Sequence, residues 1–172
     1  MRSHSLLLIA SLAALAACQT TPPAPVEVAA PAPPARDVIK ELRETAVQKR
    51  SQLDVSPLEE PAVTHLIEEA LAAESRGDNM TGRQKLNEAL RLEPRNPRLW
   101  QLLGEMEYRE GRTAEAEAHA QKSYSLGSKI GEWCTRNWLL IAEVRGARAD
   151  KEGAARARAT ADECPVYAIP SA

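Results

Sequence analysis

The sequence predicts an all-α fold in which about three helix–turn–helix repeats follow a disordered proline- and alanine-rich linker. Three observations support this prediction. Apolar residues recur at helical spacing from residue 37 onward, and no segment shows the sustained alternation of a strand. Gly77 and Gly111 each follow a charged helix end and lie 34 residues apart, which indicates a repeat. Six of the twelve prolines crowd into residues 19–36, ahead of the helical region.

The first 17 residues have the organisation of a bacterial secretory signal. Arg2 gives a positive start, and an apolar run over residues 6–17 ends in small residues before Cys18. That run of about 12 residues is short for a membrane-spanning helix, which needs about 20. A plain secretory signal with an incidental cysteine is the alternative.

The end of this run, Leu15-Ala16-Ala17-Cys18, resembles the lipobox of bacterial lipoproteins. The resemblance implies that the chain is cut before Cys18 and that the Cys18 thiol carries the lipid. Gln19, where an aspartate would favour retention in the inner membrane, implies an outer-membrane anchor facing the periplasm.

The segment 18–36 joins this cysteine to the rest of the chain. Its prolines fix φ and remove backbone donors, so neither a helix nor a central strand is expected. An extended, semi-rigid spacer is expected instead, and eighteen residues at about 3.1 Å each reach roughly 55 Å. A recognition motif for a proline-binding domain is the alternative.

An amphipathic helix is predicted over residues 37–55, because Ile39, Leu42, Ala46 and Leu53 fall near one face. Its place is left open: it could pack on the repeats, fill a groove in them or stay detached. Ser56-Pro57-Leu58-Glu59 then has the pattern of a helix start with a capping box. We therefore expect the repeat domain over residues 56–165 and a tail over residues 166–172.

The repeats resemble the tetratricopeptide repeat (TPR), a helix–turn–helix unit of 34 residues. The middle repeat, 97–130, matches the family signature at Trp100, Leu103, Gly104, Tyr108, Gly111, Ala116 and Leu126. The repeat before it, about 63–96, matches at Leu66, Ala70, Gly77, Gly82, Ala89, Leu92 and Pro94. A third repeat fits once four residues are inserted in the Ser128–Trp133 turn, through Trp138, Ile141, Ala142, Ala154 and Ala161. In that repeat Ala149 stands where the turn glycine is expected.

Two cysteines remain if Cys18 is lipidated, and an even number in an oxidising periplasm suggests a disulfide. In the register of the third repeat, Cys134 starts its first helix and Cys164 ends its second. Antiparallel helices bring these two ends together, so a Cys134–Cys164 bond is expected. Two buried free thiols are the alternative, and the absence of a Cys-x-x-Cys motif disfavours a redox-active pair.

No pattern in the sequence points to catalysis or to a cofactor. His65 and His119 are isolated from other ligand-type residues at metal-binding spacing, and no nucleophile elbow or glycine-rich phosphate loop is present. Cleavage before Cys18 removes Arg2 and no acid, which moves the net charge from −2 to −3. That mild acidity gives no indication of nucleic-acid binding.

The TPR resemblance implies a groove lined by the first helix of each repeat, in which other proteins are bound. By register it assigns partner contacts to Arg98, Gln101, Glu105, Tyr108, Arg109 and Arg136, with Glu143 beside them. Arginine and tyrosine are good interface anchors. The alternative is that these are ordinary exposed polar residues.

A lipid anchor, a spacer and a short helical array form the layout of a tethered adaptor. The layout is similar to that of the LpoP-type TPR lipoproteins, which activate bifunctional penicillin-binding proteins in peptidoglycan synthesis. The alternatives are a lipoprotein of pilus or secretion-system assembly (a pilotin), which usually has about six repeats, and a wall enzyme such as a lytic transglycosylase. The last lacks a visible catalytic domain.

Overall fold

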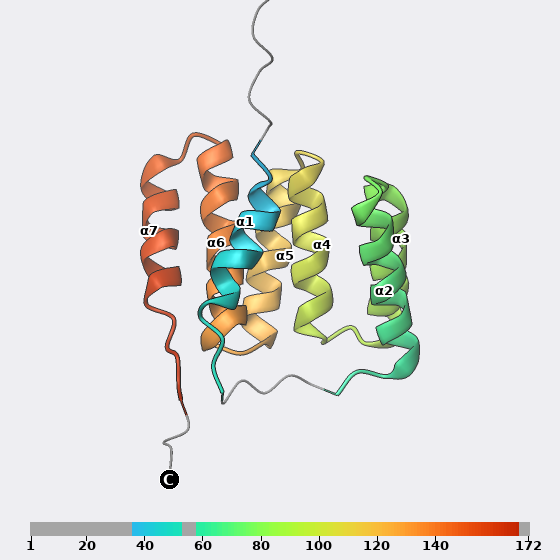
Figure 1. Cartoon of the computed structure of the whole chain (residues 1–172). Coiled ribbons are helices and arrows are strands. Elements are labelled where there is room, and N and C mark those ends of the chain that lie inside the picture. Colours follow the sequence, from blue (N-terminus) through green and yellow to red (C-terminus); the bar gives the residue numbers. More distant parts are fainter. Residues whose placement is uncertain (1–35, 53–57, 169–172) are drawn as a thin grey trace, which may run out of the picture. The chain divides into compact units, whose positions relative to one another are not determined.

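The computed structural model describes residues 36–52 and 58–168. Within these residues there are seven helices and no strand (Figure 1), so the prediction of an all-α fold is confirmed. The helices are α1 Val38–Val47, α2 Pro61–Ser75, α3 Asn79–Leu92, α4 Pro97–Arg109, α5 Thr113–Leu126, α6 Gly131–Ala147 and α7 Lys151–Asp162. The predicted signal segment, the Cys18 lipidation site and the linker up to residue 35 lie outside the described residues.

Six of the helices form three antiparallel pairs, α2 with α3, α4 with α5, and α6 with α7. Neighbouring pairs are joined by packing of α3 on α4 and of α5 on α6 (Figure 1). The predicted set of about three helix–turn–helix repeats is therefore confirmed. At the crossing of α4 and α5, a Cβ on Gly104 would lie 3.1 Å from the Ala116 carbonyl oxygen, so a small residue is required there.

The turn between the two helices of each pair contains a residue in the left-handed backbone conformation. Gly77 has φ 77°, Gly111 has φ 75° and Ala149 has φ 63°. At all three turns the amide of this residue donates to the carbonyl three residues earlier, and the next amide reaches the carbonyl five residues earlier. This is the Schellman geometry that ends many helices. The third repeat thus keeps the turn of the first two although it lacks their glycine.

Replacing Ala149 by glycine is expected to raise the free energy of unfolding by about 0.5–1 kcal/mol. The Cβ of an L-residue is strained at positive φ, and this relief outweighs the greater chain entropy of glycine. Urea denaturation measures the change. Gly111→Ala is the matched control, because a Cβ there meets no other atom within 4 Å and only the backbone effect is tested. We expect a loss of similar size; a stability gain in that variant would contradict the argument.

The four extra residues of the third repeat lengthen α6 instead of the turn before it. The connections before α4 and α6 both have four residues, 93–96 and 127–130, whereas α4 has 13 residues and α6 has 17. The predicted insertion within the Ser128–Trp133 turn is therefore wrong for residues 131–133, which belong to helix α6 and not to a turn. Four residues make about one helical turn, so adding them at the start of α6 leaves Trp138 on nearly the same face as Trp100.

A disulfide joins this extra turn of α6 to the end of the array. Cys134 lies in the extra turn and Cys164 follows α7, and their Cα atoms are 5.8 Å apart. The bond closes the α6–α7 pair at its open end, opposite the Ala149 turn.

The segments that flank the array differ from their predicted bounds. Helix α1 ends at Val47, and residues beyond it pair with the C-terminal segment, where the amide of Gln52 donates to the Tyr167 carbonyl at 3.0 Å. Helix α2 begins at Pro61, so the predicted start at residues 56–59 is wrong. Ser56 and Pro57 lie outside the described residues. The Glu59 carboxylate accepts hydrogen bonds from Asn96 and Arg98 of the next repeat.

Candidate functional site: the repeat face under the N-terminal helix

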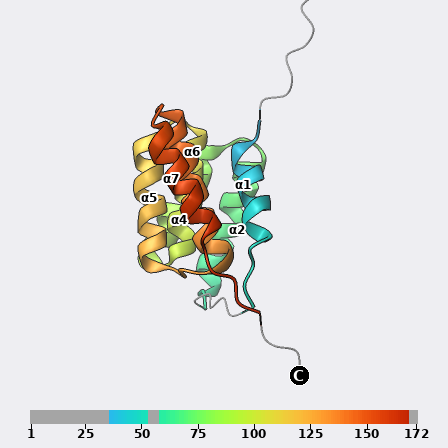
Figure 2. The same ribbon diagram turned by 90° about the vertical axis from the view of Figure 1, so that its left-hand side faces the viewer.

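The first helices of the three repeats, α2, α4 and α6, are all contacted by α1. Figures 1 and 2 show α1 lying against α6, on the side away from α5, and Arg43 of α1 reaches α2 and α4. Helix α1 buries Ile39, Leu42 and Ala46, and the first two join the apolar cluster of α5, α6 and α7. We call the surface of α2, α4 and α6 beneath α1 the seat of α1. The question that the sequence left open is thus answered: this helix packs on the repeats.

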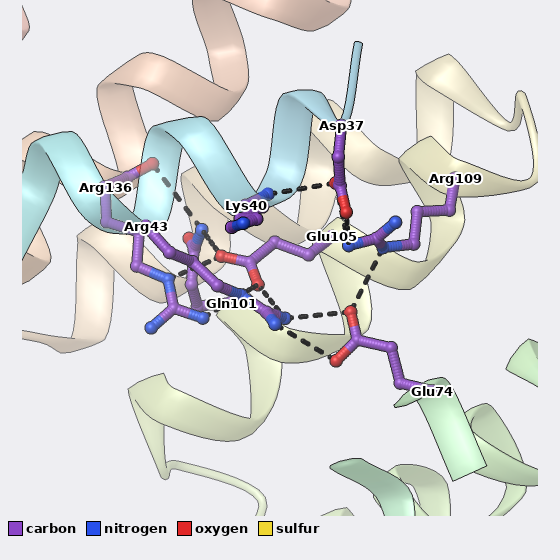
Figure 3. A network of polar contacts seen from close by, with 8 residues as sticks. All are labelled: Asp37, Lys40, Arg43, Glu74, Gln101, Glu105, Arg109 and Arg136. Carbon is purple, nitrogen blue, oxygen red and sulfur yellow. Dashed lines mark hydrogen bonds and ion pairs between the residues drawn. The ribbon is translucent and has the colours of Figure 1, made fainter. Parts of the chain in front are cut away.

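Arg43 fixes α1 to the seat by reaching two carboxylates at once (Figure 3). Its guanidinium donates to both oxygens of Glu74 in α2, at 3.0 and 3.1 Å, and to Glu105 in α4 at 2.7 Å. Arg109 extends the network, because it contacts Glu74 at 3.1 Å and Asp37, the N-cap of α1, at 3.0 Å. One network of charges therefore joins α1 to the first two repeats.

Glu105 is the centre of this network and is fully buried. Arg136 of α6 donates to its two oxygens at 2.5 and 2.7 Å, and Gln101 donates at 2.8 Å. Burial by itself would raise the pKa of Glu105, but the charges of Arg136 and Arg43 outweigh it and lower the pKa to about 2. Glu105 is therefore charged at any ordinary pH. Gln101 keeps one buried atom, Oε1, without a hydrogen-bond partner.

Two hollows open at the ends of α1. The larger, about 970 Å³, lies at the amino-terminal ends of α2, α4 and α6. Its charged and aromatic lining includes Arg50, Glu59, Arg98, Glu132, Trp133 and Arg136. The smaller, about 350 Å³, lies at the carboxyl-terminal ends of α2 and α4 and is lined by Tyr108, Arg109 and the first residues of α1.

The six residues predicted for partner contact divide into two groups. Arg98, Tyr108 and Arg109 are partly exposed: Arg98 faces the larger hollow and pairs with Glu59 at 2.8 Å, and the other two face the smaller one. Gln101, Glu105 and Arg136 are buried. The expectation that all six line an open groove is corrected for Gln101 and Glu105, which are fully buried beneath α1. Arg136 donates to Glu105 but also borders the larger hollow.

Sequence reasoning missed three residues that shape this site: Arg43, Glu74 and Trp133. Arg43 directly follows Leu42 on the apolar side of α1, and that position could have marked it as a cation facing the repeats. Glu74 resembles a solvated residue near a helix end, yet its side chain is only 7% exposed. Trp133 lies in the extra turn of α6, which was expected to be a loop.

The described residues contain no cluster of three or more potential metal ligands among His, Cys, Asp and Glu. Among the same residues, no helix has the length and apolar character needed to cross a membrane.

The fold and the seat define a helical, TPR-like repeat domain. No protein-family model matches the chain, and no curated protein matches it. Among solved structures, the globular C-terminal domain of P. aeruginosa LpoP is similar, with 28% sequence identity and a TM-score of 0.58. The similarity covers 61% of this chain and 99% of that domain. The chain therefore has an LpoP-like fold.

Proposed function

We propose that this protein is an outer-membrane lipoprotein that faces the periplasm and binds another envelope protein through its TPR-like repeats, without catalysing a reaction. We propose further that the partner is a bifunctional penicillin-binding protein, and that docking activates this peptidoglycan synthase. The single observation that carries the proposal is the LpoP-like fold, which extends over nearly all of the LpoP domain.

Two further observations support the adaptor role. Cys18 follows the Leu-Ala-Ala sequence typical of a lipidation site, ahead of the proline-rich segment. The partly exposed Tyr108 and Arg109 line one hollow, and Arg98 lines the other, so residue types that anchor protein interfaces lie at both ends of α1.

Cross-linking in cells, followed by identification of the captured protein, tests the proposal. Capture of a penicillin-binding protein is expected, and Tyr108→Ala and Arg109→Ala are each expected to reduce it at least tenfold, as truncated interface anchors commonly do. Arg156→Ala is the matched control. Arg156 is an exposed arginine of α7 whose ion pair, among the residues that the structure describes, is with Glu152 of the same helix, so its loss should leave capture unchanged.

Other outcomes would contradict the proposal in distinct ways. Capture of a secretin would favour the pilotin alternative. Cleavage of peptidoglycan by the purified protein would overturn the adaptor role altogether. Equal losses of capture in Arg156→Ala and Arg109→Ala would show that the hollows are not the contact surface.

A further inference from the structure

We propose that the seat of α1 is a helix-binding site, that α1 is its resident occupant, and that an amphipathic partner helix with an arginine at the place of Arg43 displaces α1. The inference rests on the adaptor role proposed above and specifies the chemistry of the segment that the adaptor binds. Three observations support it: Glu74 and Glu105 have partners other than Arg43, α1 is a short helix, and the seat fits side chains of a particular size and charge.

The charges of the seat remain paired when α1 is removed. Glu105 accepts hydrogen bonds from Arg43, but it also accepts two from Arg136 and one from Gln101. Glu74 accepts from Arg43, and Arg109 donates to it as well. A buried charge that loses its only partner is strongly destabilising, and that cost holds most buried ion pairs together. Here each acid has a second arginine within the repeats, so the release of α1 carries no such cost.

Helix α1 is also a short element that no second helix pairs with among the described residues. It has ten residues and buries three of them, Ile39, Leu42 and Ala46. A helix of this length is marginal on its own in water. Each of the other six helices packs in its own antiparallel pair, α2 with α3, α4 with α5, and α6 with α7. Release of α1 therefore leaves the helix–helix packing within each pair in place and uncovers the part of the α5–α7 cluster that Ile39 and Leu42 contact.

The seat specifies its occupant. Along α1 it receives apolar side chains at Ile39 and Leu42, a cation at Arg43, and at Ala46 a side chain that is fully buried and small. Arginine suits Glu74 and Glu105 because its planar fork contacts both acids at once, which the single ammonium of lysine does less well. The partner helix is thus expected to carry two apolar residues three apart, an arginine directly after the second, and a small residue three further on.

A longer partner helix gains contacts that α1 does not make. The hollows of about 970 and 350 Å³ lie at the two ends of α1 and offer Trp133 and Tyr108, respectively. Large aromatic side chains of this kind dominate binding energetics in protein interfaces. A helix that continues past either end of the seat can therefore outcompete α1 even though α1 is held in the same chain.

The test uses the mature chain, with Cys18→Ser and with residues 53–57 replaced by a protease site. After cleavage, a labelled peptide of residues 36–50 is added and its fluorescence anisotropy is followed. We expect the peptide to bind and to release the resident fragment, as seen by size-exclusion chromatography. The Arg43→Ala peptide should bind at least tenfold more weakly. The Lys40→Ala peptide should bind within twofold of the original, because the Lys40 side chain is 69% exposed and its ion pair, with Glu44 at 3.9 Å, lies within α1 itself.

Two results of this exchange experiment would overturn the inference. One is release of the resident fragment only at denaturant concentrations that unfold the repeats. The other is equal binding by the Arg43→Ala and Lys40→Ala peptides. Because the experiment contains no partner protein, its outcome is independent of which protein is captured in cells. Failure to capture a penicillin-binding protein would count against the proposed function alone.

The intact protein provides the second measurement. Arg43→Ala should increase capture of the cross-linked partner several-fold, because a larger fraction of molecules then offers an empty seat. Suppose instead that capture decreases while the circular dichroism spectrum of the variant is unchanged. This would show that α1 is part of the surface that binds the partner, and it would overturn displacement.

Discussion

Replacing Glu105 by alanine is expected to lower the free energy of unfolding by about 3–5 kcal/mol, because it removes the shared anion of two arginines. Arg136 is almost fully buried and would lose both of its short contacts, and Arg43 would lose one of its two acids. The two guanidinium groups would then repel each other, because the carboxylate between them is gone. Urea denaturation at neutral pH measures the change.

Glu143→Ala is the matched control. Glu143 also bridges two arginines, Arg36 and Arg158, but both of these are more than half exposed. Its loss should cost less than about 1 kcal/mol, as for other surface ion pairs. Equal costs in the two variants would contradict the argument, since burial is the main difference between the two sites.

The contribution of Glu105 to the free energy of unfolding also depends on pH. Because the folded pKa of about 2 lies below the ordinary value of 4.5, the stabilisation is complete above pH 4.5. It is lost progressively as the pH falls toward 2, by an amount on the order of 3 kcal/mol. Glu105→Gln should flatten this part of the stability profile relative to the unaltered protein.

Opening the Cys134–Cys164 disulfide is expected to cost about 3–4 kcal/mol, because the bond spans 30 residues and restricts the unfolded chain. The loss should be greatest for the third repeat, where no further repeat packs against α7 within the described residues. Urea denaturation of the Cys18→Ser protein, with and without reductant, measures it.

The double variant Cys134→Ala/Cys164→Ala supplies the control for this second prediction. Reductant should leave its stability unchanged, whereas it should destabilise the unaltered pair. In the Cys18→Ser protein without reductant, a thiol reagent should find no reactive cysteine. Two modified cysteines would show that the bond does not form.

The repeats could be predicted because their signals are local. A left-handed turn favours glycine, so the spacing of Gly77 and Gly111 indicated the repeat period. The same spacing located the corresponding turn of the third repeat at Ala149. The recurrence of Trp100 as Trp138 likewise showed that four residues were added. It did not show where, since an extra turn of helix and a longer loop shift the register equally.

The seat could not be predicted in the same way, because its burial depends on a helix from elsewhere in the chain. Gln101 and Glu105 are polar and one helical turn apart, which is also the pattern of a solvated face. Their neighbours Leu99, Leu102, Leu103 and Met106 recur at the spacing of a single helix face, and all four are buried. Gln101 and Glu105 lie on the opposite side of α4, so the sequence pattern alone predicts that they are exposed.

The order of elements along the chain has a mechanical consequence. Helix α1 is the first element of the folded unit, yet Arg43 grips α2 and α4 and the apolar face of α1 joins the α5–α7 cluster. Tension applied to the chain before residue 36 therefore acts first on the contacts of α1 with α2, α4 and the α5–α7 cluster, and only afterwards on the backbone of α2. If α1 yields, residues 37–60 join the tether and add a contour length of up to roughly 80 Å. If Cys18 is the anchor, as we propose, release of α1 would lengthen the tether before tension reaches the repeats.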